Sequence, residues 1–147
     1  MAVKTTSIGL SFDSAETYLV GREKIREFAT AVGERSALCH SVASAKAHGF
    51  DDVVAPVTFP IVITLELMNH VTANEQVGID WSRVVHGEQR FVYKRPVIAG
   101  DELRVTTVIE DVKSIGTHHS IVLRGDLYDA ANLLVCQVWT TLVERGE

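Results

Sequence analysis

The sequence predicts an α+β domain in which one antiparallel sheet wraps around a long central helix. Helical periodicity occurs in the first half of the chain, whereas strand-like alternation occurs in the second half. The segment Phe59–His70 is apolar nearly all round, which is typical of a helix enclosed by other structure. A chain of 147 residues suits one domain, so we expect residues 1–147 to form a single domain.

Two further helices are expected before the central one. Arg22–Val32 places its apolar side chains on one helical face, and Gly33 follows where this helix would end. Ser41–His48 is rich in alanine, with Ser41 placed to cap its start and Gly49 placed to end it. The central segment contains β-branched residues that would also suit a strand, so periodicity alone leaves both structures open there, while its length favours a helix.

Half-buried strands are expected in the second half, about five in all, because apolar and polar residues alternate along it. The expected strands are Glu88–Val97, Glu102–Val112, His118–Tyr128 and Leu134–Leu142. Turn-forming residues separate them at positions 99–101, 114–116 and 129–132. The side chains expected to face the central helix are Leu103, Val105, Leu123, Cys136 and Val138.

Composition and charge exclude several classes of function. The net charge is −5 and no Lys/Arg cluster provides the basic face that nucleic acids or anionic membranes require, so neither is an expected partner. The first residues lack the apolar segment of a signal peptide, and no apolar run reaches the ~20 residues of a membrane span. We therefore expect a soluble, cytoplasmic protein in which Cys39 and Cys136 are reduced thiols.

Several segments resemble the MaoC-like dehydratases. They are Val20–Ala29, Val54–Phe59, Arg83–Tyr93 and Arg95–Asp101. The chain is most similar to the small actinobacterial subfamily that resembles the N-terminal dehydratase domain of type I fatty acid synthase. The resemblance implies the hot-dog fold, dimerisation through the sheets, and hydration of enoyl thioesters or dehydration of (3R)-hydroxyacyl thioesters. In several actinobacterial pairs of this family one subunit carries the catalytic residues and the other has lost them, so the resemblance also implies that such a division is available to this chain.

The family's hydratase motif, Gly-Asp-x-Asn-Pro-apolar-His, is altered in this chain. Its Asp and His act as the acid and base that move protons during dehydration. Without gaps the motif falls on Gly33–Cys39, where Glu34 replaces the Asp and Cys39 replaces the His, while His40 comes one residue later. A misplacement of ~1 Å costs about a hundredfold in rate, so the alternatives are a working Glu34/His40 dyad and a solvated loop. Cys39 is expected to be a small apolar filler rather than a nucleophile.

The resemblance also places a substrate mouth before the central helix. Pro56, Thr58 and Phe59 form this mouth, and N–H groups at the helix start would bind a thioester carbonyl; the alternative is a helix entry shaped by proline. The strand beside the mouth in the family carries the positions of His86, Gly87 and Gln89. His86 is a candidate for the wall of the acyl channel, or a strand histidine satisfied by a neighbour.

No cofactor or metal site is expected. Adjacent histidines such as His118 and His119 point to opposite faces of a strand, and neither a zinc-ligand spacing nor a phosphate-binding loop is present.

Three functions remain open at this stage. The leading hypothesis is the substrate-binding, non-catalytic subunit of a heterodimeric dehydratase or hydratase, paired with a MaoC-like catalytic hot-dog chain. The second is a homodimeric enoyl hydratase that uses Glu34 and His40. The third is a binding module that senses acyl thioesters without chemistry. The sequence separates neither coenzyme A from acyl carrier protein as the thioester carrier nor short from long acyl chains.

Overall fold

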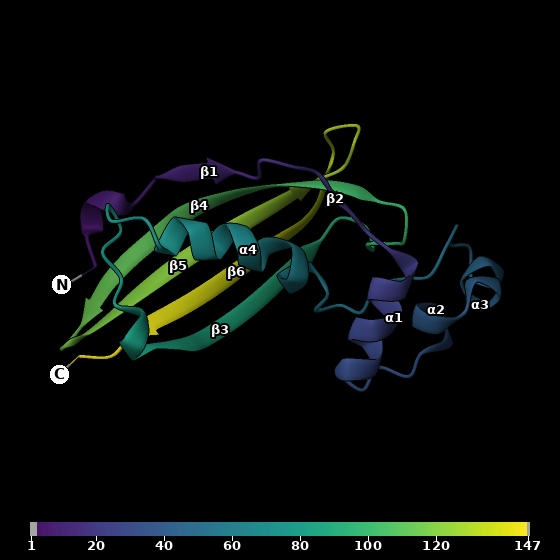
Figure 1. The fold of residues 1–147 in the computed structure, drawn as a ribbon, viewed down its shortest axis with the longest axis horizontal. Helices are drawn as coiled ribbons and strands as arrows, with labels where there is room; N and C mark the ends of the chain where they lie inside the picture. Colours follow the sequence, from purple (N-terminus) through teal and green to yellow (C-terminus); the bar gives the residue numbers. More distant parts are fainter. Residues whose placement is uncertain (1–2, 147) are drawn as a thin grey trace.

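The computed structural model describes residues 3–146 and shows a curved antiparallel sheet with one helix lying across it (Figure 1). The strands are β1 (Ser11–Asp13), β2 (Tyr18–Leu19), β3 (Val84–Tyr93), β4 (Glu102–Ile115), β5 (His118–Tyr128) and β6 (Leu134–Glu144). Their order across the sheet is β1-β4-β5-β6-β3, and β2 pairs with the start of β4. Every strand pairing is antiparallel, as the alternation predicted.

The central helix is α4, and it lies across the face of the sheet that carries the core. The helices are α1 (Arg22–Ala31), α2 (Ala37–His40), α3 (Val42–Ala47) and α4 (Pro60–Thr72), with 3-10 turns at Thr5–Ser7 and Trp81–Arg83. The five sheet residues expected to face α4 are each at most 2% exposed and share one core with Phe59, Ile63, Met68 and Val71. This arrangement is the hot-dog fold that the resemblance implied.

The expectation that α4 is enclosed on all sides was wrong within one chain. Met68 and Ile63 are buried against the sheet, but Leu65 is 50% exposed and Asn69 is also exposed. A helix that is apolar on all sides is expected to be buried on all sides, but the pattern does not say whether the burying residues come from the same chain or from a partner. The side of α4 that carries Leu65 is therefore left open by this fold.

The three N-terminal helices form a small lobe beyond one end of the sheet (Figure 1). Gly33 and Gly49 have φ of 76° and 87°, the left-handed conformation that ends helices, and the side chain of Ser41 accepts a hydrogen bond from the Ser44 N–H at the start of α3. The sequence predicted these ends correctly. It missed α2, since a helix of four residues has no room for a periodic pattern.

The strand positions agree with the sequence except at β3 and at the N-terminus. β3 runs over Val84–Tyr93 instead of Glu88–Val97, because the chain leaves the sheet after Tyr93. The Arg95 guanidinium there bonds to Asp101 at 2.8 Å and to Asp129 at 3.3 Å, which holds the connection to β4. β1 and β2 were not predicted, since strands of three and two residues are too short to show alternation. Within residues 3–146 no helix is long and apolar enough to cross a membrane.

Candidate functional site

The altered motif lies on the lobe, in the turn between α1 and α2. The Glu34 carboxylate accepts a hydrogen bond from the Ser36 N–H at 2.8 Å, and the Ser36 hydroxyl accepts one from the Leu38 N–H at 3.3 Å. The His40 Nε2 lies 2.9 Å from the backbone carbonyl oxygen of Glu34, so this nitrogen carries the proton and donates it. The His40 imidazole therefore bonds to the main chain of Glu34, while the Glu34 carboxylate caps the turn at Ser36.

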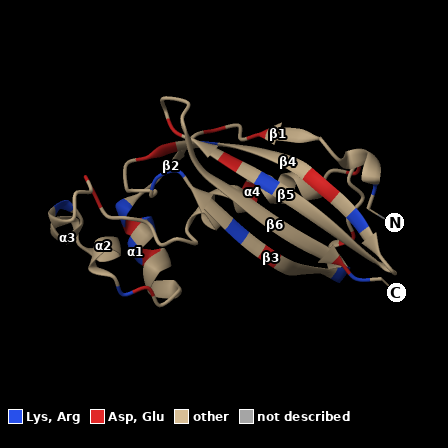
Figure 2. Cartoon of the chain, turned by 180° about the vertical axis from the view of Figure 1, so that it is seen from behind, with Lys and Arg blue, Asp and Glu red and all other residues tan. Residues whose placement is uncertain are grey.

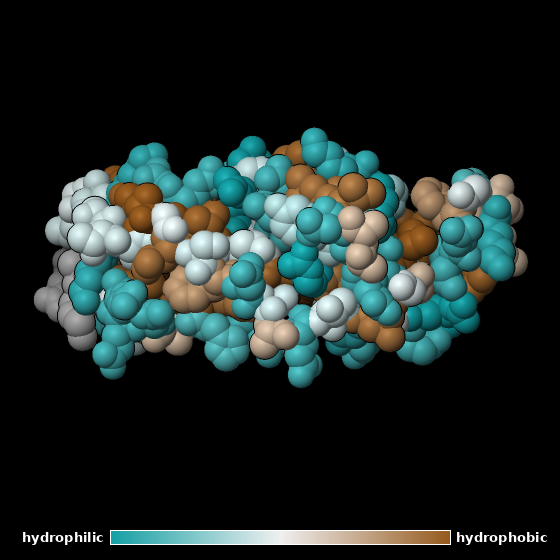
Figure 3. Space-filling model, turned by 90° about the horizontal axis from the view of Figure 1, so that it is seen from above, coloured by the Kyte–Doolittle hydropathy of each residue, from teal (hydrophilic) through white to brown (hydrophobic). Residues whose placement is uncertain are grey.

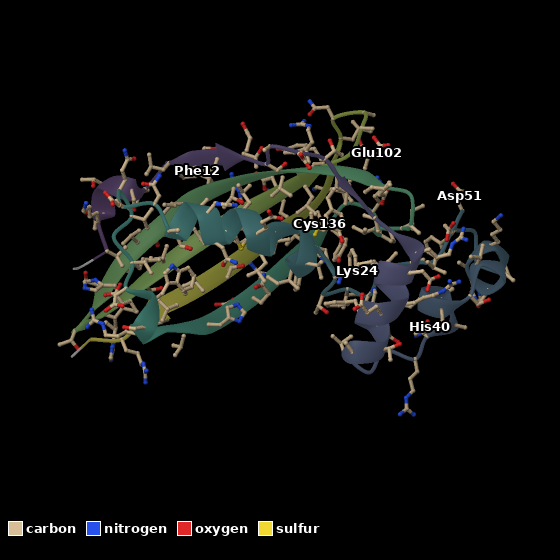
Figure 4. All side chains as sticks on the ribbon, in the orientation of Figure 1. Phe12, Lys24, His40, Asp51, Glu102 and Cys136 are labelled. Carbon is tan, nitrogen blue, oxygen red and sulfur yellow. The ribbon has the colours of Figure 1, made fainter. Side chains whose placement is uncertain are left out.

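Arginines from α1 fix the lobe around this turn. Arg26 donates from Nε to the His40 carbonyl at 3.0 Å, and Arg22 forms a bidentate pair with Asp52. The Arg22 guanidinium lowers the pKa of Asp52 to about 2. Cys39 is buried, and that burial raises the pKa of its thiol, which suits the apolar filler expected of it. Figure 4 shows His40 on the lobe, beyond the end of the sheet.

The predicted mouth is a turn that leads into α4. Phe59 is fully buried and its ring meets that of Phe28 edge-to-face, with 5.4 Å between the ring centres, whereas Thr58 is exposed. The sequence left open whether the N–H groups at the helix start bind a thioester carbonyl or whether this is a helix entry shaped by proline. In the structure the Ile61 N–H donates to the Thr58 carbonyl and the Val62 N–H donates to the Phe59 carbonyl.

The predicted strand residues lie on β3, where a polar chain runs inward from the surface. His86 Nε2 lies 3.1 Å from Gln89 Oε1, which also accepts a hydrogen bond from the buried Thr140 hydroxyl at 3.0 Å. Gln89 itself donates to the Trp139 carbonyl at 2.9 Å. Gly87 is the extra residue of a β-bulge, and a Cβ there would approach the Val143 side chain to 3.2 Å.

An apolar cavity of about 200 Å³ lies between α4 and this part of the sheet. Its walls are formed by Ile61, Leu65, Met68, Asn69, Trp81, His86, Leu123, Thr140 and Leu142. Almost all of this lining is hydrocarbon, and His86 is its one titratable side chain. The cavity suits an alkyl chain much better than a charged group.

Within one chain the structure does not bring His86 beside the Pro56–Phe59 turn. The β3 residue that contacts this turn is Tyr93, whose hydroxyl donates to the Val57 carbonyl at 2.8 Å. Burial raises the pKa of Tyr93, so its hydroxyl stays protonated as a donor. Sequence analysis missed Tyr93. Its side chain lies on the same face of β3 as those of Gln89 and Phe91, so the alternation along the strand is the signal that could have identified it.

Among residues 3–146 no three His, Cys, Asp or Glu side chains lie close enough to hold a metal ion.

The curved sheet around α4 defines a hot-dog protein, and comparison with known proteins places it among the dehydratase-like members of this fold. Residues 6–138 match the family model "FAS1-like, dehydratase domain region", so the chain belongs to this family. A UPF0336 protein of Streptomyces coelicolor is 46% identical over 146 residues, which cover 99% of this chain and 97% of that protein.

Two solved structures show the same fold. The first is the C-terminally truncated HadBC (3R)-hydroxyacyl-ACP dehydratase complex of Mycobacterium tuberculosis, with a TM-score of 0.86 and 30% identity over 93% of this chain and 96% of that chain. The second is a MaoC-like dehydratase with a TM-score of 0.89 and 27% identity, covering 95% of this chain and 42% of the longer one. The MaoC-like resemblance stated from the sequence is confirmed.

Proposed function

We propose that this chain is the substrate-binding, non-catalytic subunit of a two-chain (3R)-hydroxyacyl-thioester dehydratase or enoyl-thioester hydratase. The observation that carries the proposal is the use of Glu34 and His40 as turn-forming groups. A general acid and base must point at the reacting carbons, but here the carboxylate caps Ser36 and the imidazole bonds to a main-chain carbonyl. In this proposal neither group serves as the acid or the base of the reaction.

The cavity under α4 supports the substrate-binding half of this proposal. It is apolar, and it is bordered by the exposed Leu65 and by His86 of the edge strand β3. An acyl chain entering there would remove hydrocarbon from water, which is the main source of affinity for such a ligand. In this proposal His86 and Gln89 line the entrance, and the Pro56–Phe59 turn with Tyr93 shapes the opposite end.

The need for a partner is supported by what this fold leaves open and by the relatives. β3 pairs only with β6, so its other edge has no strand partner within the described chain. The HadBC structure, 30% identical to this chain, is a complex of hydroxyacyl-ACP dehydratase subunits. A second hot-dog chain with an intact Asp and His motif would supply the acid and base that this chain lacks.

The test measures hydration of crotonyl or longer enoyl thioesters, and the loss of the enoyl-thioester absorbance reports the rate. The chain alone should turn over little, since a correctly placed acid and base each contribute about 10²–10⁴-fold. Addition of a MaoC-like partner with an intact motif should restore turnover. Glu34→Ala should change the restored rate little, whereas His86→Ala should raise KM for longer acyl chains.

His48→Ala is the matched control, because this histidine is exposed on the lobe and its ring hydrogen-bonds to the Ser44 carbonyl of its own helix. Robust turnover by the lone chain that disappears in Glu34→Ala or His40→Ala would refute the proposal. That result would establish the alternative of a homodimeric hydratase that works through Glu34 and His40.

A further inference from the structure

A second cavity, of about 440 Å³, lies between α4 and residues 14–18, the segment that connects β1 to β2. α4 lies between β1 and β3, which form opposite edges of the sheet, so this cavity is on the β1 side of the helix (Figure 1). Leu103 and Val105 of β4 complete its walls. This β1-side cavity shares no lining residue with the apolar cavity beside His86.

The two cavities contact opposite faces of α4. Ile63, Glu66, Leu67 and His70 line the β1-side cavity, and their spacing of three and four residues places them on one helical face. With about 3.6 residues per turn, this face points roughly away from the face of Leu65, which borders the other cavity. The β1-side cavity is therefore a separate site and not an extension of the first.

The segment between β1 and β2 is anchored at both ends and arches away from β4 between them. The Ser14 N–H donates to the Val105 carbonyl at 2.8 Å, and the Val105 N–H donates to the Ser14 hydroxyl at 3.1 Å. Tyr18 is paired with Leu103. The chain thus advances four residues from Ser14 to Tyr18 while β4 advances two, from Val105 to Leu103, so two extra residues form the arch.

Hydrocarbon and charge divide the lining of this cavity. Its inner wall consists of core residues, with Leu103 fully buried, whereas Glu16, Glu66 and His70 are exposed around it. These three side chains form no hydrogen bond or ion pair with any residue in the range 3–146. Seen from the β1 side, hydrophobic patches lie among hydrophilic side chains (Figure 3). The cavity therefore offers an apolar wall together with carboxylates that are free to bind.

Negative charge on this lining is unopposed. None of its described residues is Lys or Arg, and Figure 2 shows an acidic residue and no basic one on the connection between β1 and β2. Lys24, whose charge acts on Tyr18, is not part of the lining and pairs with Glu27 at 3.3 Å. Burial raises the pKa of Tyr18, so its hydroxyl stays neutral and adds an acceptor without a positive charge.

We propose that the β1-side cavity binds a small organic cation, a primary amine with a short hydrocarbon body. The hydrocarbon would leave water by covering the apolar wall, and the ammonium N–H groups would donate to the carboxylates of Glu16 and Glu66. A cavity of this volume suits a ligand of that size. An anion would be repelled by both carboxylates, and within residues 3–146 no three acidic, His or Cys side chains lie close enough to hold a metal ion.

This inference goes beyond the proposed function, because it involves neither the acyl cavity nor a catalytic partner. Either can fail without the other, since the two cavities share no residue.

The test is an NMR titration of the full chain with three probes of equal chain length. n-Hexylamine is a cation at about pH 8, as a lysine side chain is, whereas n-hexanol is neutral and hexanoate is an anion. Hexylamine should shift the amide signals of residues 14–18, 63–70 and 103–105 saturably. Hexanol should bind there at least about threefold more weakly, because it forms no ion pair, and hexanoate should not bind there.

Carboxylate variants then identify the contacts. Glu16→Gln and Glu66→Gln should each weaken hexylamine binding about two- to fivefold, the range that exposed ion pairs provide, and should leave hexanol binding unchanged. Glu75→Gln is the matched control, because it removes an exposed carboxylate that does not line the cavity. Circular dichroism of each variant verifies that it is folded.

Four results would overturn the inference. They are the absence of saturable shifts, shifts confined to the residues around the apolar cavity beside His86, hexanol binding as tightly as hexylamine, and Glu75→Gln weakening binding as much as Glu16→Gln and Glu66→Gln do.

Discussion

Thr107 on β4 provides a sharp test of how polar groups are accommodated under α4. Its side chain is fully buried, pointing to the helix side like Val105 and Ile109. Within the described chain its hydroxyl is the one buried side-chain polar atom without a hydrogen-bond partner. A buried hydroxyl that has lost its water without gaining a partner costs about 1–3 kcal/mol.

Thr107→Val replaces this hydroxyl with a methyl group of similar shape and keeps a β-branched residue in the strand. We expect the free energy of unfolding to rise by about 1–2 kcal/mol, because the desolvation cost disappears while the packing is kept. For a chain of this size that change raises Tm by roughly 2–8 °C. The measurement is urea unfolding together with a thermal melt of the wild type and the variant.

Thr140→Val is the matched control, because it makes the same chemical change at another buried site on the core face of the sheet. The Thr140 hydroxyl donates to Gln89 at 3.0 Å, so removing it should lower the free energy of unfolding by about 1 kcal/mol. The two substitutions should therefore shift stability in opposite directions. Equal destabilisation by both would show that the Thr107 hydroxyl is satisfied in solution and would refute the reasoning.

Three further predictions concern the lobe and the core. Phe59→Ala should lower the free energy of unfolding by about 3–5 kcal/mol in a urea titration, because it empties a fully buried site against Phe28; a loss below 1 kcal/mol would contradict that packing. Since Arg22 lowers the pKa of Asp52 from 3.8 to about 2, that pair stabilises the fold above pH 3.8 and the contribution is lost as the pH falls toward 2. The Tm difference between wild type and Asp52→Asn should therefore be constant at higher pH and vanish near pH 2; a pH-independent difference would exclude the ion pair as its cause. Burial raises the pKa of Cys136 to about 12, so this thiol should resist Ellman's reagent until the protein unfolds, and fast labelling of the native protein would show that the core is open.

Much of the fold was predictable because its signals are local. The alternation over Glu102–Val112 is a property of neighbouring residues, and the structure buries the predicted face from Leu103 to Ile109. The ends of α1 and α3 were predictable for the same reason, since glycine adopts a positive φ and a serine hydroxyl caps a helix start. The shortest elements gave no such signal.

The candidate site was less predictable, because its geometry depends on which atoms of neighbouring groups meet. The sequence places Glu34 and His40 six residues apart, and the structure brings the His40 ring to the main chain of Glu34. Only the fold decides that the imidazole bonds to the Glu34 carbonyl and leaves the carboxylate to cap Ser36. His40 is the last residue of the short helix α2, from which its ring reaches the Glu34 carbonyl. No periodic pattern in the sequence predicted this helix.

The sequence by itself determined the fold class and the residues of the core, which follow from spacing along the chain, and it indicated the family through the resemblance of four segments. The tertiary structure decided that Tyr93 meets the Pro56–Phe59 turn while His86 lies at the far end of β3 beside the cavity under α4. It also decided that the β3 edge and one side of α4 stay open. The physical reason is that strand register and helix placement set contacts between residues far apart in the chain, and no local pattern encodes them.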